Sequence, residues 1–230
     1  MSLLAAEYQQ RRKRLIIPHV RTSIAVISEE TIHLIRYYLA LVLFVSFPPL
    51  LSFWLLVHPF VRFWRKLGPV WTYTIVGLIV LFEVLLLFAI RKRVLFIEFG
   101  TNRFLIVVGL FCLLGASRLR VLISRHVTNA LLLGLHEIGP EEYPGQLVDA
   151  GLYGRIRHPR YVQIALALLG YSLVTNYLAL YIIFAICVAE LYLIVLLEEK
   201  ELWSRFGMEY EEYCHRVPRF MPRLRKRASK

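Results

Sequence analysis

Charged residues and cysteines are scarce in this chain of 230 residues. Only 19% of the residues are charged, 58% are hydrophobic, and the mean hydropathy is +0.57. Soluble domains carry about 25% charged residues and a smaller apolar share. The three cysteines, Cys112, Cys187 and Cys214, form no CxxC pair and no spacing with histidine that is typical of zinc, so no metal site is expected. This composition predicts an integral membrane protein.

Acidic residues are also few, 16 against 28 lysines and arginines, which gives a formal net charge of +12. The basic residues cluster beside apolar runs, at residues 11–14, 62–66, 91–93 and 223–230. Such clusters fit anionic lipid headgroups. No basic stripe interleaved with aromatic residues lies on a soluble domain, so nucleic-acid binding is not expected. The first 30 residues lack the apolar core of a signal peptide, so we expect the first membrane helix to direct insertion.

Long apolar runs make up most of the remaining chain. They predict an all-α integral membrane fold with about five transmembrane helices and a C-terminal helical hairpin. The runs cover residues 35–61, 70–90, 104–123, 162–174 and 178–197. Pro48 and Pro49 are expected to kink the first run or to break it, with a re-entrant hairpin as the alternative.

Two polar segments interrupt this pattern, at residues 146–161 and 198–222. The apolar residues between them are long enough to cross the bilayer and return, with a turn at residues 175–176, so both segments are expected on one membrane face. Pro159 suits the first turn of a helix, which points His158 and the amides after it into a polar pocket. The residues alone fit two interpretations: a binding site, or a structural cluster in which the histidine caps a helix and the acids pair with arginines.

The polar segments carry motifs in a fixed order: GLYGRIRHPRY, then EEKEL after the hairpin, then FGMEYEEY and VPRFMP. In this order and spacing they resemble the C-terminal signature of the isoprenylcysteine carboxyl methyltransferase family and its phospholipid methyltransferase relatives. The resemblance covers residues 146–222. The preceding residues resemble the family only in being membrane helices.

The resemblance implies an enzyme that binds S-adenosylmethionine between the hairpin and the C-terminal segment. By position, the implied cofactor contacts are Leu147, Val148, Tyr153, His158, Pro159, Arg160, Tyr161 and Glu198. The two tyrosines can pack on the adenine or ribose, and His158 with the following amides can meet the cofactor carboxylate. Glu198 can accept hydrogen bonds from the ribose hydroxyls or the α-amino group. The chain has no glycine fingerprint of the dinucleotide-binding type, which agrees with a family that does not use that fold.

Two positions depart from the isoprenylcysteine enzymes. Ile194 stands where they have an arginine one helical turn before the acidic pair, and Gln163 stands where relatives usually have glycine. Both changes weaken the case for a prenylcysteine carboxylate substrate and leave the cofactor contacts intact. The candidates for contact with the acceptor are Arg157, Gln163, Glu190 and Ile194. No catalytic residue is identified, because transfer to a carboxylate, thiolate or free amine mainly requires positioning and exclusion of water.

The sequence therefore predicts an integral membrane methyltransferase that uses S-adenosylmethionine and acts on a lipophilic small molecule, lipid or prenylated acceptor. Two alternatives stay open: an NADPH-dependent sterol-type reductase, whose family carries a similar RHPxY segment in a longer chain, and a non-catalytic membrane interaction protein. The basic tail predicts a site on the cytoplasmic face of a multi-pass protein of the bacterial inner membrane or endoplasmic reticulum. The expected divisions are an interfacial segment 1–30, membrane helices 31–135, a cofactor-binding and catalytic region 136–222, and a basic tail 223–230.

Overall fold

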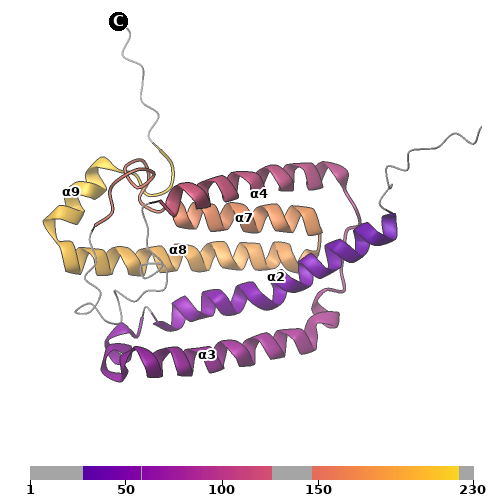
Figure 1. Ribbon diagram of the computed structural model, residues 1–230, viewed down its shortest axis with the longest axis horizontal. Coiled ribbons are helices and arrows are strands. Elements are labelled where there is room, and N and C mark those ends of the chain that lie inside the picture. The colour runs from indigo at the N-terminus through magenta and orange to yellow at the C-terminus, as the bar shows by residue number, and fades with distance from the viewer. Residues whose placement is uncertain (1–27, 58, 126–146, 223–230) are drawn as a thin grey trace, which may run out of the picture.

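The structure is a computed structural model that describes residues 28–57, 59–125 and 147–222. Within these ranges the chain forms six helices and one isolated β-bridge, and Figure 1 shows the long helices running side by side. The helices are α2 (Glu29–Val57), α3 (Val61–Val94), α4 (Arg103–Ile123), α7 (Pro159–Thr175), α8 (Leu178–Phe206) and α9 (Met208–Arg216). The predicted all-α class is confirmed. Most of the expected interfacial segment, the basic tail and residues 126–146 lie outside the described residues.

Helix α2 is a single continuous helix of 29 residues that includes Pro48 and Pro49. The alternative of a re-entrant hairpin at the two prolines is therefore wrong. The helix begins after Ser28, whose hydroxyl accepts a hydrogen bond from the amide of Thr31 at 3.2 Å, as an N-cap residue does. A continuous α2 carries its aromatic C-terminal half to the end of the bundle where the polar segments meet (Figure 1).

Helix α3 contains a sharp change of direction at Gly68, whose φ of 79° and ψ of 164° are not helical. Glycine adopts a positive φ without the steric cost that other residues have, and Pro69 then suits the first turn of the continuing helix. The part before the kink buries Trp64, which donates a hydrogen bond to the Leu56 carbonyl at 2.8 Å. Beyond the kink the helix is long and apolar, as predicted for residues 70–90.

Helices α4 and α7 pack closely at two facing glycines. A Cβ atom on Gly109 would lie 2.7 Å from the carbonyl oxygen of Gly170, and one on Gly170 would lie 2.8 Å from that of Gly109. Small residues allow such close contact between membrane helices. The contact joins the first half of α4 to the last part of α7.

The predicted hairpin is confirmed. Helix α7 ends at Thr175, Asn176 adopts the left-handed conformation with φ 57°, and α8 begins at Leu178. Helix α8 continues to Phe206, well beyond the predicted apolar run, and Gly207 with φ 51° joins it to α9. In the C-terminal segment, Tyr210 and Tyr213 are buried with Val217 and pack against Leu147 and Phe206.

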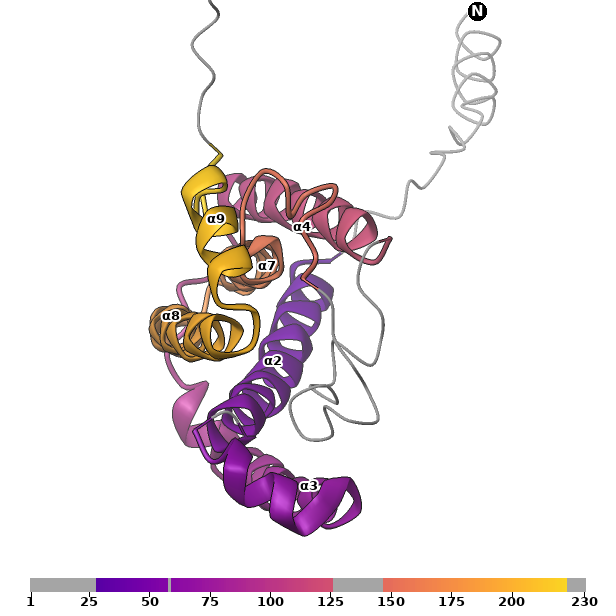
Figure 2. The ribbon, with the colours of Figure 1, turned by 90° about the vertical axis from the view of Figure 1, so that its left-hand side faces the viewer.

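Four helices are long and apolar enough to cross a membrane: α2, α3, α4 and α8. The predicted number was about five, and the difference is α7, which has 17 residues and is about 25 Å long at 1.5 Å per residue. Viewed from the end, α2 lies between α3 and the pair α7 and α8, and α4 covers α7 (Figure 2). The chain is thus a multi-pass membrane protein, and the short α9 follows the end of α8.

Candidate functional site

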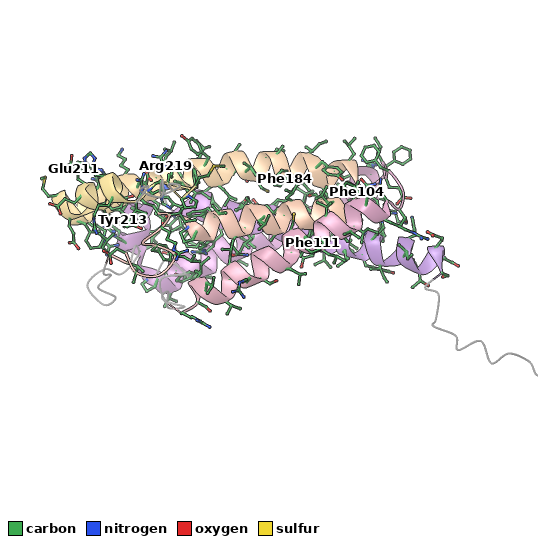
Figure 3. All side chains as sticks on the ribbon, turned by 90° about the horizontal axis from the view of Figure 1, so that it is seen from above. Phe104, Phe111, Phe184, Glu211, Tyr213 and Arg219 are labelled. Carbon is green, nitrogen blue, oxygen red and sulfur yellow. The ribbon has the colours of Figure 1, made fainter. Side chains whose placement is uncertain are left out.

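The two polar segments meet at one end of the bundle. The amide of Arg157 donates to the carbonyl of Pro218 at 2.9 Å, and the amide of His158 donates to that of Arg219 at 3.1 Å. Figure 3 shows Arg219 and Tyr213 at this end and Phe104 at the opposite end. The residues before α7 and those after α9 therefore form one unit, as the hairpin geometry predicted.

Glu199 is at the centre of this unit, although only 12% of its side chain is exposed. Its carboxylate accepts a hydrogen bond from Arg157 Nη2 at 3.1 Å, from His158 Nε2 at 3.0 Å and from Arg219 Nε at 3.0 Å. Arg157 also donates to the carbonyl oxygens of Cys214 and Val217 at 3.1 and 2.8 Å. A single carboxylate thus compensates two guanidinium groups and an imidazole drawn from both polar segments.

His158 lies between two carboxylates and is 4% exposed. Its Nδ1 is 3.5 Å from Glu198 Oε2, and its Nε2 is 3.0 Å from Glu199 Oε1. Burial alone lowers the pKa of His158, but the hydrogen bonds to Glu198 and Glu199 outweigh burial and raise it above the usual value. The rings of Tyr161 and Phe220 lie 5.7 and 6.0 Å from the imidazole. The site therefore favours a protonated imidazole between the two carboxylates.

Tyr153 is linked to α9 by a backbone hydrogen bond, and its phenol is influenced by the charge of Glu198. Its carbonyl accepts a hydrogen bond of 2.7 Å from the Tyr213 hydroxyl, which fixes the GLY turn onto α9. Burial, and then the charge of Glu198, raise the pKa of Tyr153 to about 12, so its phenol stays protonated at neutral pH. Leu147 packs against the cluster of Tyr210 and Tyr213, and Val148 beside it is half-buried.

A cavity of about 790 Å³ lies between α2, α3, α4, α7 and α8. It brings together four of the residues singled out in the sequence: Arg160, Tyr161, Gln163 and Ile194. Its other described lining residues are Phe47, Leu50, Leu51, Phe53, Trp54, Tyr73, Arg120, Ile164 and Leu191. The Arg160 guanidinium lies 5.1 Å from the Trp54 ring centroid, a cation–π geometry.

A second cavity of about 370 Å³ lies on the other side of Tyr161, between α7 and α8. Its described lining is apolar or aromatic and includes Phe184, Leu191, Tyr192 and Phe220. Phe184 lies midway along the bundle (Figure 3). Tyr161 and Leu191 line both cavities and separate them.

Two of the expected acceptor contacts lie away from the described walls of both cavities. Arg157 is instead engaged by Glu199 and by backbone carbonyls. Glu190 is half-buried on α8 and is absent from the described lining. Glu190 was a candidate for contact with the acceptor, but which residues of α8 line a cavity depends on how the neighbouring helices pack around α8.

Sequence reasoning missed three residues. It identified the acidic pair but chose Glu198, because the sequence does not show which of two successive helical positions faces the RHP segment. Arg219 was not singled out, although the VPRF motif that contains it was noted. Arg120 was not singled out, and the α2 aromatics were taken only as part of a membrane span. The helix packing brings them to the site.

The donors and acceptors present fit S-adenosylmethionine. A sulfonium cofactor with an ammonium group and ribose hydroxyls needs an accessible carboxylate, and the Glu198 side chain is 32% exposed. Its carboxylate group needs donors, and the amides of Arg160 and Tyr161 lie in the first turn of α7, where amides have no helical acceptor. Within the described residues no group of three or more His, Cys, Asp or Glu side chains is placed to hold a metal ion.

Comparison with known families gives one match: residues 104–209 match the family described as phospholipid methyltransferase. That family includes enzymes similar to isoprenylcysteine carboxyl methyltransferase, so the resemblance seen in the sequence is confirmed. The match begins at the start of α4, earlier than the motifs alone indicated, and it ends in α9. It includes Arg120, His158 and the acidic pair. No solved structure matches this chain.

Two curated proteins are similar to part of the chain. A nickel-cobalt-cadmium resistance protein of Alcaligenes xylosoxydans xylosoxydans is 37% identical over 79 residues, which are 34% of this chain and 37% of that protein. A cobalt-zinc-cadmium resistance protein of Cupriavidus metallidurans is 37% identical over 78 residues, which are 34% of this chain and 36% of that protein. The similarity thus spans little more than a third of each relative.

Proposed function

Because residues 104–209 match the phospholipid methyltransferase family, we propose that the protein is an integral membrane methyltransferase that uses S-adenosylmethionine to methylate a lipophilic acceptor. The proposed site faces the cytoplasm. The observation that carries the proposal is the position of Glu198: a partly exposed carboxylate beside a clamped His158, at the N-terminus of α7 and next to a large cavity.

Glu199 supports the proposal as the residue that positions the site. It holds Arg157, His158 and Arg219 with one carboxylate, so these groups are compensated before any ligand binds. Preorganised groups cost little reorganisation when a ligand arrives. Glu198 on the adjacent position is then the acidic side chain with room to accept hydrogen bonds from the cofactor.

The remaining cofactor contacts follow from the same arrangement. The first-turn amides of Arg160 and Tyr161 are suited to a carboxylate, and the Tyr153 phenol, kept protonated, can donate a hydrogen bond. The Tyr161 ring offers an aromatic surface for adenine. When bound, S-adenosylmethionine supplies a methyl group activated by a positively charged sulfur.

The acceptor is proposed to occupy the cavity of about 790 Å³, whose walls come from helices that cross the membrane. Aromatic and aliphatic walls exclude water and hold the acceptor against Tyr161, which forms a wall on the α7 side. In this arrangement the chain contributes positioning and a dry environment, which is what methyl transfer mainly requires.

Cofactor binding tests the proposal. Purified full-length protein in detergent is expected to bind S-adenosylmethionine by calorimetry, and Glu198→Gln is expected to weaken binding at least tenfold. Glu212→Gln is the matched control, because Glu212 is exposed on α9. Binding of NADPH instead of S-adenosylmethionine would favour the reductase alternative, and binding of neither would favour a non-catalytic protein.

A labelled-methyl assay on membrane lipid extract tests the acceptor. With the wild-type protein, label from methyl-labelled S-adenosylmethionine is expected in the organic phase, and Glu198→Gln should reduce it in proportion to the loss of cofactor affinity. Label that appears only in protein would reject a free lipid acceptor while leaving the methyltransferase proposal intact.

A further inference from the structure

Arg120 is the cavity residue for which the sequence predicted no role in the site. It lies in the last turn of α4, at the same end of the bundle as His158, and it lines the cavity of about 790 Å³. Arg160 and Gln163 line this cavity from α7. None of the described lining residues is acidic. The polar part of the described wall therefore consists of two guanidinium groups, one amide, two tyrosine hydroxyls and the indole N–H of Trp54.

The arginines near the site differ in how their charge is compensated. Arg157 and Arg219 are paired with Glu199, and Arg160 lies over the ring of Trp54. The Arg120 side chain has no hydrogen bond, ion pair or ring contact with another described residue, and the residue is exposed. A guanidinium beside apolar walls is strongly stabilised by an anionic partner, and its planar fork matches the geometry of carboxylate and phosphate groups.

We propose that Arg120 is a specificity-determining residue that binds an acidic group, a carboxylate or a phosphate, of the lipophilic acceptor, with Arg160 assisting from the opposite helix. This inference rests on the proposed function and names the chemistry of its acceptor. The apolar remainder of the acceptor occupies the aromatic part of the cavity formed by α2 and α3, where Trp54 and Tyr73 lie.

An acceptor with a cationic amine group fits this cavity poorly. A cationic headgroup in the same place would face Arg120 and Arg160 with no described carboxylate in the wall, and like charges at such range repel. Discrimination against cationic acceptors therefore follows from the same two residues that attract the acid.

The chain offers a matched control on the same helix. Arg118 lies half a turn before Arg120, is also exposed, and is absent from the described lining of the cavity. Both arginines lie near the end of a membrane-crossing helix, where arginine side chains commonly reach lipid headgroups. If Arg120 only contacts headgroups, Arg118→Ala and Arg120→Ala should behave alike.

The experiment uses purified full-length protein in a neutral detergent, with oleate, oleyl phosphate and oleyl alcohol as probes of one chain length. Thermal unfolding and calorimetry are expected to show saturable binding of at least one acidic probe by the wild type and by Arg118→Ala, and no comparable binding of the alcohol. Arg120→Ala should bind the acidic probe at least tenfold more weakly, and Arg120→Lys should recover part of the loss. The preference for oleate or oleyl phosphate tells a carboxylate from a phosphate.

The inference is overturned if neither acidic probe binds the wild type, if Arg120→Ala binds as well as the wild type, or if Arg118→Ala loses as much. S-adenosylmethionine binding is measured on the same samples and is expected to be equal in all variants. Loss of cofactor binding in every sample, including the wild type, counts against the proposed function, whereas the acidic-probe series judges Arg120 separately.

Discussion

Clusters of charged side chains lie at both ends of the helix bundle, one around Arg36 and one around Glu199. At the end where α7 turns into α8, the buried cation Arg36 donates to the Thr175 carbonyl at 2.9 Å and to Thr101 Oγ1 at 3.1 Å, and it lies 3.8 Å from the Glu98 carboxylate. At the site end, the half-buried carboxylate of Glu199 is surrounded by three cationic side chains. The first cluster joins loops, whereas the second joins the two segments that carry the motifs.

The difference supports the proposal that the Glu199 cluster, and not the Arg36 cluster, borders a binding site. The Arg36 cluster ties α2 to the turn after α7 and to the loop before α4, and Asn176 there donates to the Gly100 carbonyl at 3.0 Å. Both loops are further joined by the bridge between Glu98 and Tyr177. The Glu199 cluster instead has a second carboxylate, Glu198, beside it, and two cavities that meet at Tyr161. The cavity beside Glu198 is the larger, about 790 Å³ against about 200 Å³ for the cavity lined by Ile97 and Leu178 at the other end, and this contrast can be tested at each end.

The largest effect is expected from Glu199→Ala. Removing this carboxylate leaves Arg157, His158 and Arg219 without their shared partner, and breaking a buried ion pair by removing one side costs roughly 3 kcal/mol or more. Thermal unfolding in detergent should show the loss, and S-adenosylmethionine binding should disappear with it. Glu212→Ala on α9 is the control. Unchanged stability of Glu199→Ala would mean that the three cations do not depend on Glu199.

Arg36→Leu should destabilise the protein by a smaller amount and leave the site intact. The Thr175 carbonyl would lose its charged donor, and an unsatisfied buried acceptor costs about 2 kcal/mol. Thermal unfolding measures the loss, and calorimetry on the folded fraction should give the wild-type affinity for S-adenosylmethionine. Arg103→Leu at the same end is the control, because Arg103 is largely exposed. Weakened cofactor binding in Arg36→Leu would contradict the separation of the two ends.

His158, at the site end, should make the stability of the protein depend on pH. The pKa of His158 is raised in the folded protein by its hydrogen bonds to Glu198 and Glu199. Its stabilising contribution is therefore complete below the unfolded-state pKa of about 6.5 and is lost as the pH rises through the folded-state pKa. Unfolding temperatures measured from about pH 5.5 to about pH 9, a range that begins below the unfolded-state pKa, should fall more steeply in the wild type than in His158→Gln. Parallel pH profiles would show that His158 is not charged between the two glutamates.

Periodicity and motif spacing predicted the elements of both ends. The turn at Asn176, the start of α7 at Pro159 and the break at Gly207 each follow from local residue chemistry, because proline suits a helix start and Asn and Gly adopt positive φ. Local rules were less successful at Pro48 and Pro49, where a possible break was expected and α2 is continuous. Helix α2 packs against α3, α7 and α8, and these contacts cannot be read from the residues of α2 alone.

The site was predictable to the level of its segments and less so to the level of its atoms. Sequence order gave the meeting of the RHP and EE motifs, but adjacent helical positions point in different directions, so the clamped residue was Glu199 and the more exposed one Glu198. The contribution of Arg120 and Trp54 was not predictable, because it depends on how α2 and α4 pack against α7. The contact between Gly109 and Gly170 sets the packing of α4 on α7, and only the three-dimensional arrangement reveals it.

The smallest effect is expected from Arg65→Ala, next to the site but outside the Glu199 cluster. Arg65 Nη2 lies 3.0 Å from Glu201 Oε1 and joins the start of α3 to α8, with 36% of the arginine side chain exposed. Exposed ion pairs contribute about 0.5 kcal/mol, and salt screens them. Thermal unfolding should therefore shift slightly at low salt and not measurably at about 1 M salt, with Arg62→Ala as the exposed control. If Arg65→Ala destabilises the protein as much as Arg36→Leu does, the ion pair between Arg65 and Glu201 is not a weak surface pair.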